Sequence, residues 1–510
     1  MDLIPSFKVF FLKSLLTKLI CNNIFQVILH ICFLYMISKL LFVEPPRNYW
    51  FIMGEYLPPP SALLILAAYV ERELPDLEIE ILDCQAEHLN WEGLEKYIES
   101  SKPSMILTSG FTCNAFTCAR TCEIAKKVNE DIITVAGGIH FSFTPEESLL
   151  NFPEIDIIVR GEGELTIVEL IKTLNKGGKL NKIQGISTRH KTTIVHTPSR
   201  PLIKNLDSLP YPAYHLVEDN LKKYHFTMMA GRNTRYMILE TARGCEYKCS
   251  FCTQWNNWGG IWRTKSTKRI ANEIEFLNEN YGGVFLWLTD DHVNLSYRGK
   301  QLYEELRSRR CKEDIMLFFQ ARTYDVAGNA DLIPKLRDVS VYWIMCGVEN
   351  DSEENLKEYK KGITKSDAYT AMKILNKNDI FAHAMFVIGS RRDSHESIES
   401  LRRFSVDIAP DLALYTTLTP FPGTIYYEIA KKNGWIEDYN YANYDMAHAI
   451  MPTETLTRKE VQEELYRCYK NFYGSIPKSI AGVLSINKLK RTIYRHMAGQ
   501  FVLSKLRRLT

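Results

Sequence analysis

Short apolar runs alternate with amphipathic helical stretches along most of the chain, and this alternation constrains the fold more than any other feature. In the N-terminal third, apolar runs cover residues 40–43, 77–82, 104–107, 132–135 and 155–159. The helical patterns that follow them cover residues 61–74, 91–100, 112–128, 145–151 and 164–174. Strands followed by helices of this length favour a parallel sheet covered on both faces. We therefore predict an α/β fold that begins with a doubly wound domain.

A second series of the same kind occupies the middle of the chain. Its apolar runs start at residue 236 and continue at 284–288, 316–320, 341–346, 381–388 and 412–416. Between them, the stretch 268–281 places Ile270, Ile274, Leu277 and Tyr281 on one helical face. Six βα units predict a partial (βα)6 barrel, in which polar residues at the carboxyl ends of the strands are candidate site residues.

The chain has 510 residues, enough for two or three domains. At 45% hydrophobic and 24% charged residues, it is globular and not disordered. We predict the following organisation: a hydrophobic extension at 1–35, a doubly wound domain at 36–175, a proline-braced linker at 176–235, a barrel at 236–440 and a helical, basic region at 441–510.

The N-terminal extension admits three interpretations. Residues 19–38 lack Asp, Glu, Lys and Arg for 20 residues, which is long enough to span a bilayer. They also contain Asn22, Asn23, Gln26 and His30, which are costly in lipid, and run directly into the first predicted strand. We favour a non-native or dispensable extension, with the compact fold beginning near Met36. A membrane anchor and an ordered extra helix are the alternatives.

Charge indicates few partners. The net charge of +3 implies no overall field for a polyanion, so nucleic acid is not an expected partner. Residues 481–510 hold seven Lys and Arg and no Asp or Glu. We interpret them as a solvated helix face, and contact of this stretch with a membrane surface or nucleic acid is the alternative.

Six of the twelve cysteines fall into two groups of three. The first group, Cys113, Cys118 and Cys122, lies on a predicted helix and reads as packing. The second, Cys245, Cys249 and Cys252, forms C-x3-C-x2-C in a loop. Three thiolates at this spacing can hold one face of a cubane cluster and leave one iron open, whereas a structural zinc site requires four protein ligands.

The second group resembles the motif of the radical S-adenosylmethionine (SAM) superfamily, with Phe251 as the aromatic residue before the last cysteine. The resemblance implies a [4Fe-4S] cluster on the three cysteines and SAM at the carboxyl ends of the strands. An aspartate would suit the methionyl ammonium, an arginine the carboxylate and a glutamate the ribose hydroxyls. The alternative for each residue is an ordinary loop ion pair. The expected SAM-binding residues are Phe251, Asp290, Asp291, Gln320, Arg322 and Glu349.

The loops of the first domain resemble those of cobalamin-binding domains. No G-x-G-x-x-G follows the first strand, so a dinucleotide site is not supported. The glycine loops at 137–140 and 161–164 match the cobalamin family in order and spacing. Residues 44–50 lack the histidine that ligates cobalt in many of its members, so the resemblance implies cobalamin without a histidine lower ligand. A sheet without cofactor is the alternative. The expected cobalamin-contacting residues are Glu44, Thr108, Ser109, Gly137, Gly138, Gly161, Glu162 and Gly163.

Together, residues 39–440 resemble the cobalamin-dependent radical SAM enzymes. The resemblance implies that a 5′-deoxyadenosyl radical removes hydrogen from an unactivated carbon and that methylcobalamin then donates its methyl group. We expect a cytoplasmic methyltransferase that acts on an sp3 carbon of a peptide or protein side chain or of a small molecule. Its electron donor would be ferredoxin or flavodoxin.

Two alternative functions remain. An oxidative cyclase of the anaerobic magnesium-protoporphyrin monomethyl ester type shares both domains but oxidises its substrate. A cobalamin-binding sensor with a structural cluster would form no deoxyadenosine from SAM.

Overall fold

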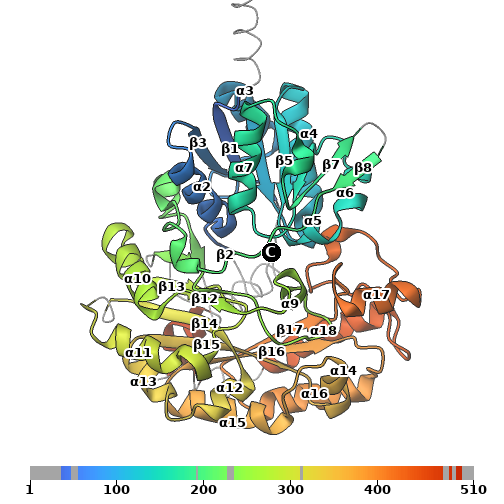
Figure 1. Ribbon diagram of the computed structural model, residues 1–510. Coiled ribbons are helices and arrows are strands. Elements are labelled where there is room, and N and C mark those ends of the chain that lie inside the picture. The colour runs from blue at the N-terminus through green and yellow to red at the C-terminus, as the bar shows by residue number, and fades with distance from the viewer. Residues whose placement is uncertain are drawn as a thin grey trace, which may run out of the picture.

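The computed structural model contains two α/β halves, with the N-terminal half above the barrel (Figure 1). It describes residues 36–47, 56–190, 193–226, 235–310, 314–474, 480, 482–484 and 490–496. The extension 1–35 lies outside the described residues, as does most of the basic stretch 481–510. No helix within the described ranges is long and apolar enough to cross a membrane.

The first sheet confirms the predicted doubly wound domain. Its strand order is β3-β1-β4-β5-β6-β7-β8, and the first five strands are parallel. These five are β1 (Lys39–Glu44), β3 (Glu78–Asp83), β4 (Met105–Ser109), β5 (Ile133–Gly137) and β6 (Ile157–Val159). The helices are α2 (Ser61–Glu73), α3 (Trp91–Ser101), α4 (Ala115–Val128), α5 (Ile139–Phe143), α6 (Pro145–Asn151) and α7 (Glu164–Asn175). Because β1 pairs with β3 on one side and β4 on the other, the switch point lies between the ends of β1 and β4, where open α/β sheets bind ligands.

The predicted linker 176–235 is partly wrong, because its first part continues this sheet. Strands β7 (Ile186–His190) and β8 (Thr193–His196) form an antiparallel hairpin, and β7 pairs with β6. The hairpin strands are short and largely polar, so they lack the apolar run that identified the other strands. Further along, β9 (His225–Phe226) pairs with β2 (Tyr56–Leu57), which joins the end of the linker to the first domain.

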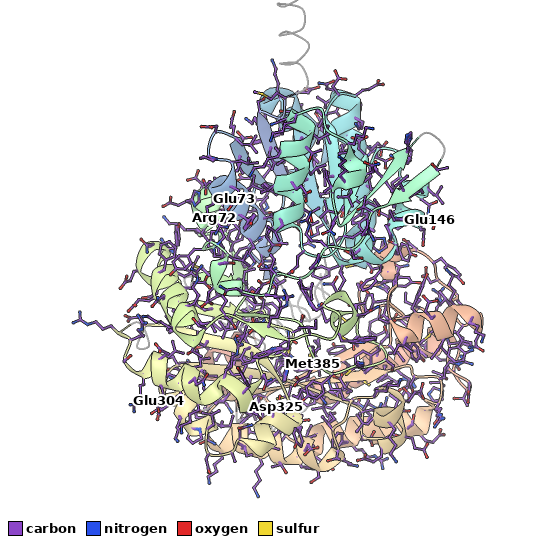
Figure 2. All side chains as sticks on the ribbon, in the orientation of Figure 1. Arg72, Glu73, Glu146, Glu304, Asp325 and Met385 are labelled. Atoms are coloured by element: carbon purple, nitrogen blue, oxygen red, sulfur yellow. The ribbon has the colours of Figure 1, made fainter. Side chains whose placement is uncertain are left out.

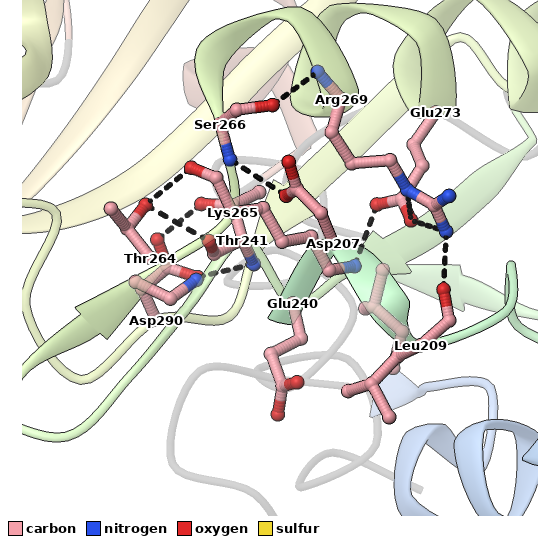
Figure 3. Close-up of polar contacts among 12 residues, drawn as sticks. Asp207, Leu209, Glu240, Thr241, Thr264, Lys265, Ser266, Arg269, Glu273 and Asp290 are labelled. Carbon is pink, nitrogen blue, oxygen red and sulfur yellow. Dashed lines mark hydrogen bonds and ion pairs between the residues drawn. The ribbon is translucent and has the colours of Figure 1, made fainter. Parts of the chain in front are cut away.

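The second half of the linker is braced against the barrel (Figure 3). Asp207 accepts a hydrogen bond from the Ser266 backbone N–H at 2.8 Å, and the Leu209 carbonyl accepts one from Arg269 at 2.8 Å. Arg269 and the buried Lys265 both pair with Glu273 on α10 (Thr267–Tyr281). These contacts fix the path of the chain as it enters the barrel.

The second sheet confirms the predicted partial barrel. Six parallel strands follow one another in chain order: β10 (Tyr236–Leu239), β13 (Phe285–Leu288), β14 (Met316–Arg322), β15 (Val341–Glu349), β16 (Phe381–Ile388) and β17 (Leu412–Thr417). The helices that follow are α10, α11 (Lys300–Arg307), α12 (Thr323–Gly328), α13 (Ile333–Asp338), α14 (Glu353–Glu358), α15 (Lys365–Lys377), α16 (His395–Asp407) and α17 (Ile425–Lys432). The first and last strands are not paired with each other, so the barrel is open.

Side chains on the two faces of this sheet belong to separate cores. On β10, Met237 and Leu239 pack with the helices, whereas Tyr236 and Ile238 pack inside the barrel. The interior core is aromatic and includes Phe285, Phe318, Trp343 and Phe381. This alternation follows from the two-residue period of a strand.

Helix α18 (Arg458–Tyr473), predicted at 459–469, covers the edge strand β17. The Tyr469 hydroxyl accepts from the Tyr415 N–H at 3.0 Å and donates to the Tyr415 carbonyl at 2.6 Å. Tyr473 makes the same pair of bonds to Ala413, at 3.1 and 2.7 Å. Two side chains one helical turn apart therefore satisfy backbone groups that an edge strand would otherwise leave unpaired.

Candidate active site

The loop that carries the three predicted cluster ligands begins at Gly244, directly after the short strand β11 (Ala242–Arg243). Gly244 has a φ of +90°, and a Cβ there would lie 2.1 Å from the Ile261 carbonyl oxygen. Only glycine fits this position. The chain can therefore turn sharply into Cys245 at the carboxyl end of the first barrel strand.

Hydrogen bonds hold the rest of the loop to the barrel. Ser250 donates from its backbone to the Tyr359 carbonyl at 2.9 Å and from its hydroxyl to the Glu358 carbonyl at 2.9 Å. Phe251 packs edge-on against the Tyr359 ring at 5.3 Å. Trp255 Nε1 donates to the Cys249 carbonyl at 3.0 Å. The loop is thus positioned independently of any bound group.

The three thiols suit a cluster. Cys249 lies close enough to Cys245 and to Cys252 to raise the pKa of both, and Cys245 also raises the pKa of Cys252. Burial raises the pKa of Cys245 to about 11 and that of Cys252 to about 12, so both need an adjacent cation to become thiolates, as iron provides. In the described ranges, no three His, Cys, Asp or Glu side chains form a site for a single metal ion. A cubane differs because each cysteine binds its own iron atom.

Two of the predicted SAM-binding residues flank the cluster loop. The Arg322 guanidinium lies over the Tyr247 ring, 3.5 Å from its centroid, and its charge acts on Cys245. Glu349 is buried with a φ of +64° and accepts a hydrogen bond from Lys361 Nζ at 2.6 Å. Arg322 also donates to the Lys361 carbonyl. Gln320 is half-buried and lies two residues before Arg322 on β14, on the same face of the sheet.

The two neighbouring aspartates differ in their environments. Asp290 is buried and pairs with Arg298, and it accepts bonds from Thr241 and Ala242 (Figure 3). Its carboxylate is therefore committed to the barrel and is not available to an ammonium group, contrary to our expectation. Asp291 accepts a hydrogen bond from Trp258 Nε1 at 2.8 Å, and burial raises its pKa to about 7. It lies close enough to Cys245 and Cys252 to raise their pKa values.

Two further residues belong to this group and were not predicted. Lys361 pairs with Glu349 and lies close enough to Cys249 to feel its charge. Glu240 follows β10, and its side chain points away from the Asp290 network (Figure 3). Burial raises the pKa of Glu240, and Arg243 is its hydrogen-bond donor. The rule that selects polar residues at strand ends could have found Glu240, whereas Lys361 lies in a loop with no pattern.

Glycines at the carboxyl edge of the first sheet bring backbone close to the place where a ligand would lie. Gly138 has a φ of +91°, and a Cβ there would lie 2.7 Å from the Ser109 hydroxyl and 2.8 Å from the Gly110 backbone. Gly137 ends β5 beside them. Gly161 follows β6, and no atom lies within 4 Å of the position that its Cβ would take. Without side chains, the tight turn at Gly138 and the uncovered backbone at Gly161 leave room for a large ligand to approach this edge of the sheet.

Three predicted cobalamin contacts have other roles. Thr108 is fully buried and donates to Cys118 Sγ at 3.4 Å, so its side chain packs on α4. Gly163 lies against Leu66 and Ile167 of neighbouring helices. Glu162 is buried in ion pairs with Arg243 and Arg263. A strand pattern could not show that the Thr108 side chain faces a helix or that a residue 81 positions away pairs with Glu162.

Glu44 occupies the switch point at the end of β1. Burial raises the pKa of its carboxyl to about 7, although Arg47 pairs with it at 3.0 Å. The nearby Asp83 raises the pKa further. Glu44 is therefore a partly protonated, desolvated acid at the predicted ligand edge.

The first cysteine group lies close by, and the burial of Cys118 and Cys122 in the core confirms that they pack.

Buried ion pairs join the two domains beside the cluster loop. Arg243, two residues before Cys245, donates to Glu162 at 2.7 Å and Glu164 at 2.6 Å. Arg263, its partner on β12 (Arg263–Thr264), donates to Glu162 at 2.9 Å. Burial alone would lower the pKa of Arg243, but Glu164, Glu240 and Glu162 raise it well above its ordinary value. The loop after β6 and the loop after β10 are thus held against each other.

Comparison with known proteins agrees with this arrangement. The B12 binding domain matches residues 54–171, and the Radical SAM superfamily matches residues 239–405. An uncharacterized methyltransferase of Pyrococcus horikoshii is 29% identical over 439 residues, which cover 86% of this chain and 93% of that protein. The anaerobic magnesium-protoporphyrin IX monomethyl ester cyclase of Cereibacter sphaeroides is 28% identical over 400 residues, covering 78% of this chain and 64% of that protein.

A solved structure shares the whole architecture. The radical SAM methyltransferase TsrM from Kitasatospora setae, with cobalamin and a [4Fe-4S] cluster bound, is 17% identical with a TM-score of 0.68. The match covers 92% of this chain and all of that chain (100%). The domain pair and its order make this chain a cobalamin-dependent radical SAM enzyme. More particularly, it is an enzyme of the methyltransferase type within that family.

Proposed function

We propose that the chain transfers a methyl group to an unactivated sp3 carbon, with a [4Fe-4S] cluster, SAM and cobalamin as cofactors. The observation that carries the proposal is the Arg243 junction, which holds the cysteine loop of the radical SAM domain against the glycine loops of the B12-binding domain. When bound, the cluster would supply the electron that cleaves SAM and cobalamin would carry the methyl group.

The chain's own residues would bind and orient these groups. Cys245, Cys249 and Cys252 would hold the cluster, and Arg322 and Asp291 would face the methionyl carboxylate and ammonium of SAM. The buried Glu349, held by Lys361, would accept hydrogen bonds from the ribose hydroxyls of SAM. The loops at Ser109, Gly138 and Gly161 would receive cobalamin, without a histidine below the metal. The chemistry requires a reducing compartment such as the cytoplasm, and ferredoxin or flavodoxin would supply electrons.

A search for the product tests the proposal. Reconstituted enzyme, reductant and methyl-deuterated SAM are incubated anaerobically with a small-molecule and peptide extract, and products are followed by mass spectrometry. Methylation predicts a product that carries the labelled methyl group, with one deoxyadenosine and one S-adenosylhomocysteine formed per product. A product that gains oxygen and no label would instead support the cyclase, the alternative favoured by the Cereibacter relative.

A further inference from the structure

Trp258 lies beside the turn that leads the chain into the cluster loop. It directly follows the short helix α9 (Gln254–Asn257) and is half-buried. A Cβ added at Gly244 would lie 3.0 Å from the Trp258 Cβ, so the tryptophan packs directly against this turn. Its indole N–H donates to Asp291 Oδ2 at 2.8 Å. Trp258 therefore connects the cluster loop to an acid at the end of the second barrel strand.

Two arginines of the junction between the domains lie over the Trp258 ring. The guanidinium carbons of Arg243 and Arg263 are 5.8 and 5.4 Å from the ring centroid. Both arginines are buried and paired with Glu162 of the first domain, which fixes their positions. An indole ring attracts cations that lie over its face. The direction of the indole N–H is therefore held by the junction as well as by the cluster loop.

The main chain at Asp291 is anchored through the next residue, whereas its carboxylate depends on Trp258. His292 is buried, and its Nε2 lies 2.6 Å from Asp325 Oδ2 on the barrel helix α12 (Figure 2). The Trp258 N–H and the Gly244 backbone both favour the charged form of the Asp291 carboxylate. Because the two oxygens of a carboxylate can accept about four hydrogen bonds, Asp291 keeps lone pairs for a further donor.

The charges around Asp291 favour the arrival of a cation. Asp291 is half-buried and, unlike Asp290, forms no ion pair with any of the described residues. The neighbouring Asp290 and Glu240 are acidic and raise its pKa, and Asp291 in turn raises the pKa of Cys245 and Cys252. A carboxylate among negative groups is stabilised when a cation joins it, and the methionyl ammonium of SAM is such a cation.

We propose that Trp258 is a positioning residue for SAM: its indole N–H fixes the Asp291 carboxylate so that this carboxylate receives the methionyl ammonium beside the cluster loop. The inference rests on the proposed function, since that function assigns Asp291 to SAM. The N–H stabilises the charged carboxylate and restricts its rotation, so less conformational freedom is lost when SAM binds. Arg243 and Arg263 keep the donor in place.

SAM binding to the full-length enzyme, reconstituted anaerobically with cluster and cobalamin, tests this role. Equilibrium dialysis with radiolabelled SAM measures the dissociation constant. Trp258→Phe keeps a ring beneath the arginines but removes the N–H, and we expect it to weaken SAM binding about fivefold or more. Its iron content should stay at about four atoms per chain, because no cluster ligand is lost. Trp435→Phe is the matched control, since Trp435 also lies under an arginine, Arg391, and it should bind SAM as the wild type does.

A double-mutant cycle with Asp291→Ala separates positioning from a general loss of structure. In the Asp291→Ala protein, Trp258→Phe should weaken SAM binding less than about twofold further, because the acid on which the N–H acts is absent. A tryptophan that only supports the fold would weaken binding by the same factor in both backgrounds. Asp291→Asn takes the place of Asp291→Ala in the cycle if the alanine variant binds too weakly to measure.

Three results would overturn the inference. They are unchanged SAM binding in Trp258→Phe, an equal loss in both backgrounds of the cycle, and a loss of iron from Trp258→Phe that accounts for its weaker binding. Any of them would leave Trp258 as a residue of the fold alone.

Product analysis of the same preparations separates this inference from the proposed function. If the wild type forms a methylated product while Trp258→Phe binds SAM normally, only the role of Trp258 is wrong. If the cycle gives the expected result but no methylated product forms, Trp258 positions SAM and the proposed methylation is wrong. If the wild type with a complete cluster binds no SAM, both are wrong.

Discussion

Cys245, Cys249 and Cys252 are the residues on which the proposed chemistry depends most. Replacement of any one by alanine should lower bound iron from about four atoms per chain to well below that and abolish deoxyadenosine formation, because the cluster loses a ligand. Cys346→Ala is the matched control, since Cys346 is buried on the helix-facing side of the same barrel. Iron analysis and chromatography measure the outcome. A Cys249→Ala variant with full iron and activity would contradict the assignment.

The burial of the Glu44 carboxyl predicts that the stability of the cofactor-free protein depends on pH. Its folded pKa of about 7 lies above its ordinary value of 4.5, so the folded state favours the proton. The charged Glu44 therefore lowers the free energy of unfolding. This loss is absent below about pH 4.5, grows as the pH rises toward 7 and reaches its full value of about 3 kcal/mol above pH 7. Glu44→Gln should therefore stabilise the protein at about pH 8 and change little at about pH 5.

Urea unfolding at both pH values measures this difference. Glu99→Gln, on the exposed face of α3, is the control and should change stability little at either pH. An equal effect of Glu44→Gln at both pH values would show that Glu44 is not the desolvated acid that its contacts imply.

Residue types at strand ends predicted the neighbourhood of the site but not the pairing of its charges. Cys245, Arg322 and Glu349 come together as expected because parallel strands end at one edge. Glu162 and Asp290 also lie at that edge, yet Arg243 and Arg298 neutralise them. These partners are set by tertiary packing and leave no local pattern in the sequence.

At the scale of elements, the strand alternation was sufficient to predict both sheets, because the parallel strands are mostly buried and apolar, and even the partly exposed edge strand β3 keeps a buried apolar end. The β7–β8 hairpin was missed because it lies at the sheet edge, with partly exposed and polar residues. The role of α18 was also missed. Its amphipathic pattern indicates a helix, but the pattern does not show that two tyrosine hydroxyls would replace a neighbouring strand.

The tyrosine contacts of α18 predict a specific loss of stability. Tyr469→Phe or Tyr473→Phe leaves a backbone N–H and a carbonyl of β17 without their partner, which should cost about 1–2 kcal/mol of unfolding free energy each. Tyr466→Phe on the same helix is the control, because Tyr466 is 60% exposed. Denaturant unfolding measures the three variants. Equal stabilities would mean that the hydroxyls do not support the edge strand.

At the scale of the whole molecule, the Arg243 junction links the two cofactor domains. A second contact lies farther along, where the Tyr441 hydroxyl donates to Glu147 at 2.9 Å and its ring packs on His140 at 4.9 Å. Both contacts hold the first domain over the open end of the barrel (Figure 1). The sequence could not predict this docking, since it depends on residues 79 and 294 positions apart.

Loosening the junction should uncouple the two halves of the reaction. In Arg243→Gln, we expect deoxyadenosine to form while S-adenosylhomocysteine per deoxyadenosine falls about tenfold or more, because the two domains lose their alignment. Arg309→Gln, which breaks an ion pair within the barrel, is the control and should keep the wild-type ratio. Breaking a buried ion pair also destabilises the folded protein, so a second variant is needed. The double variant Glu162→Gln/Glu164→Gln removes the same ion pairs from the other domain. It should give the same ratio of S-adenosylhomocysteine to deoxyadenosine as Arg243→Gln. An unchanged ratio in both junction variants would refute the coupling.

The central claim is that one enzyme uses SAM in two ways, as a radical source and as a methyl donor. The most direct test incubates the anaerobically reconstituted, titanium-reduced enzyme with SAM and hydroxocobalamin, which the reductant converts to the cob(I)alamin that accepts the methyl group, and quantifies both SAM-derived products. The account predicts that 5′-deoxyadenosine and S-adenosylhomocysteine both form, and that neither forms without reductant or in the cysteine variants. The absence of both products from fully reconstituted wild-type enzyme would contradict it.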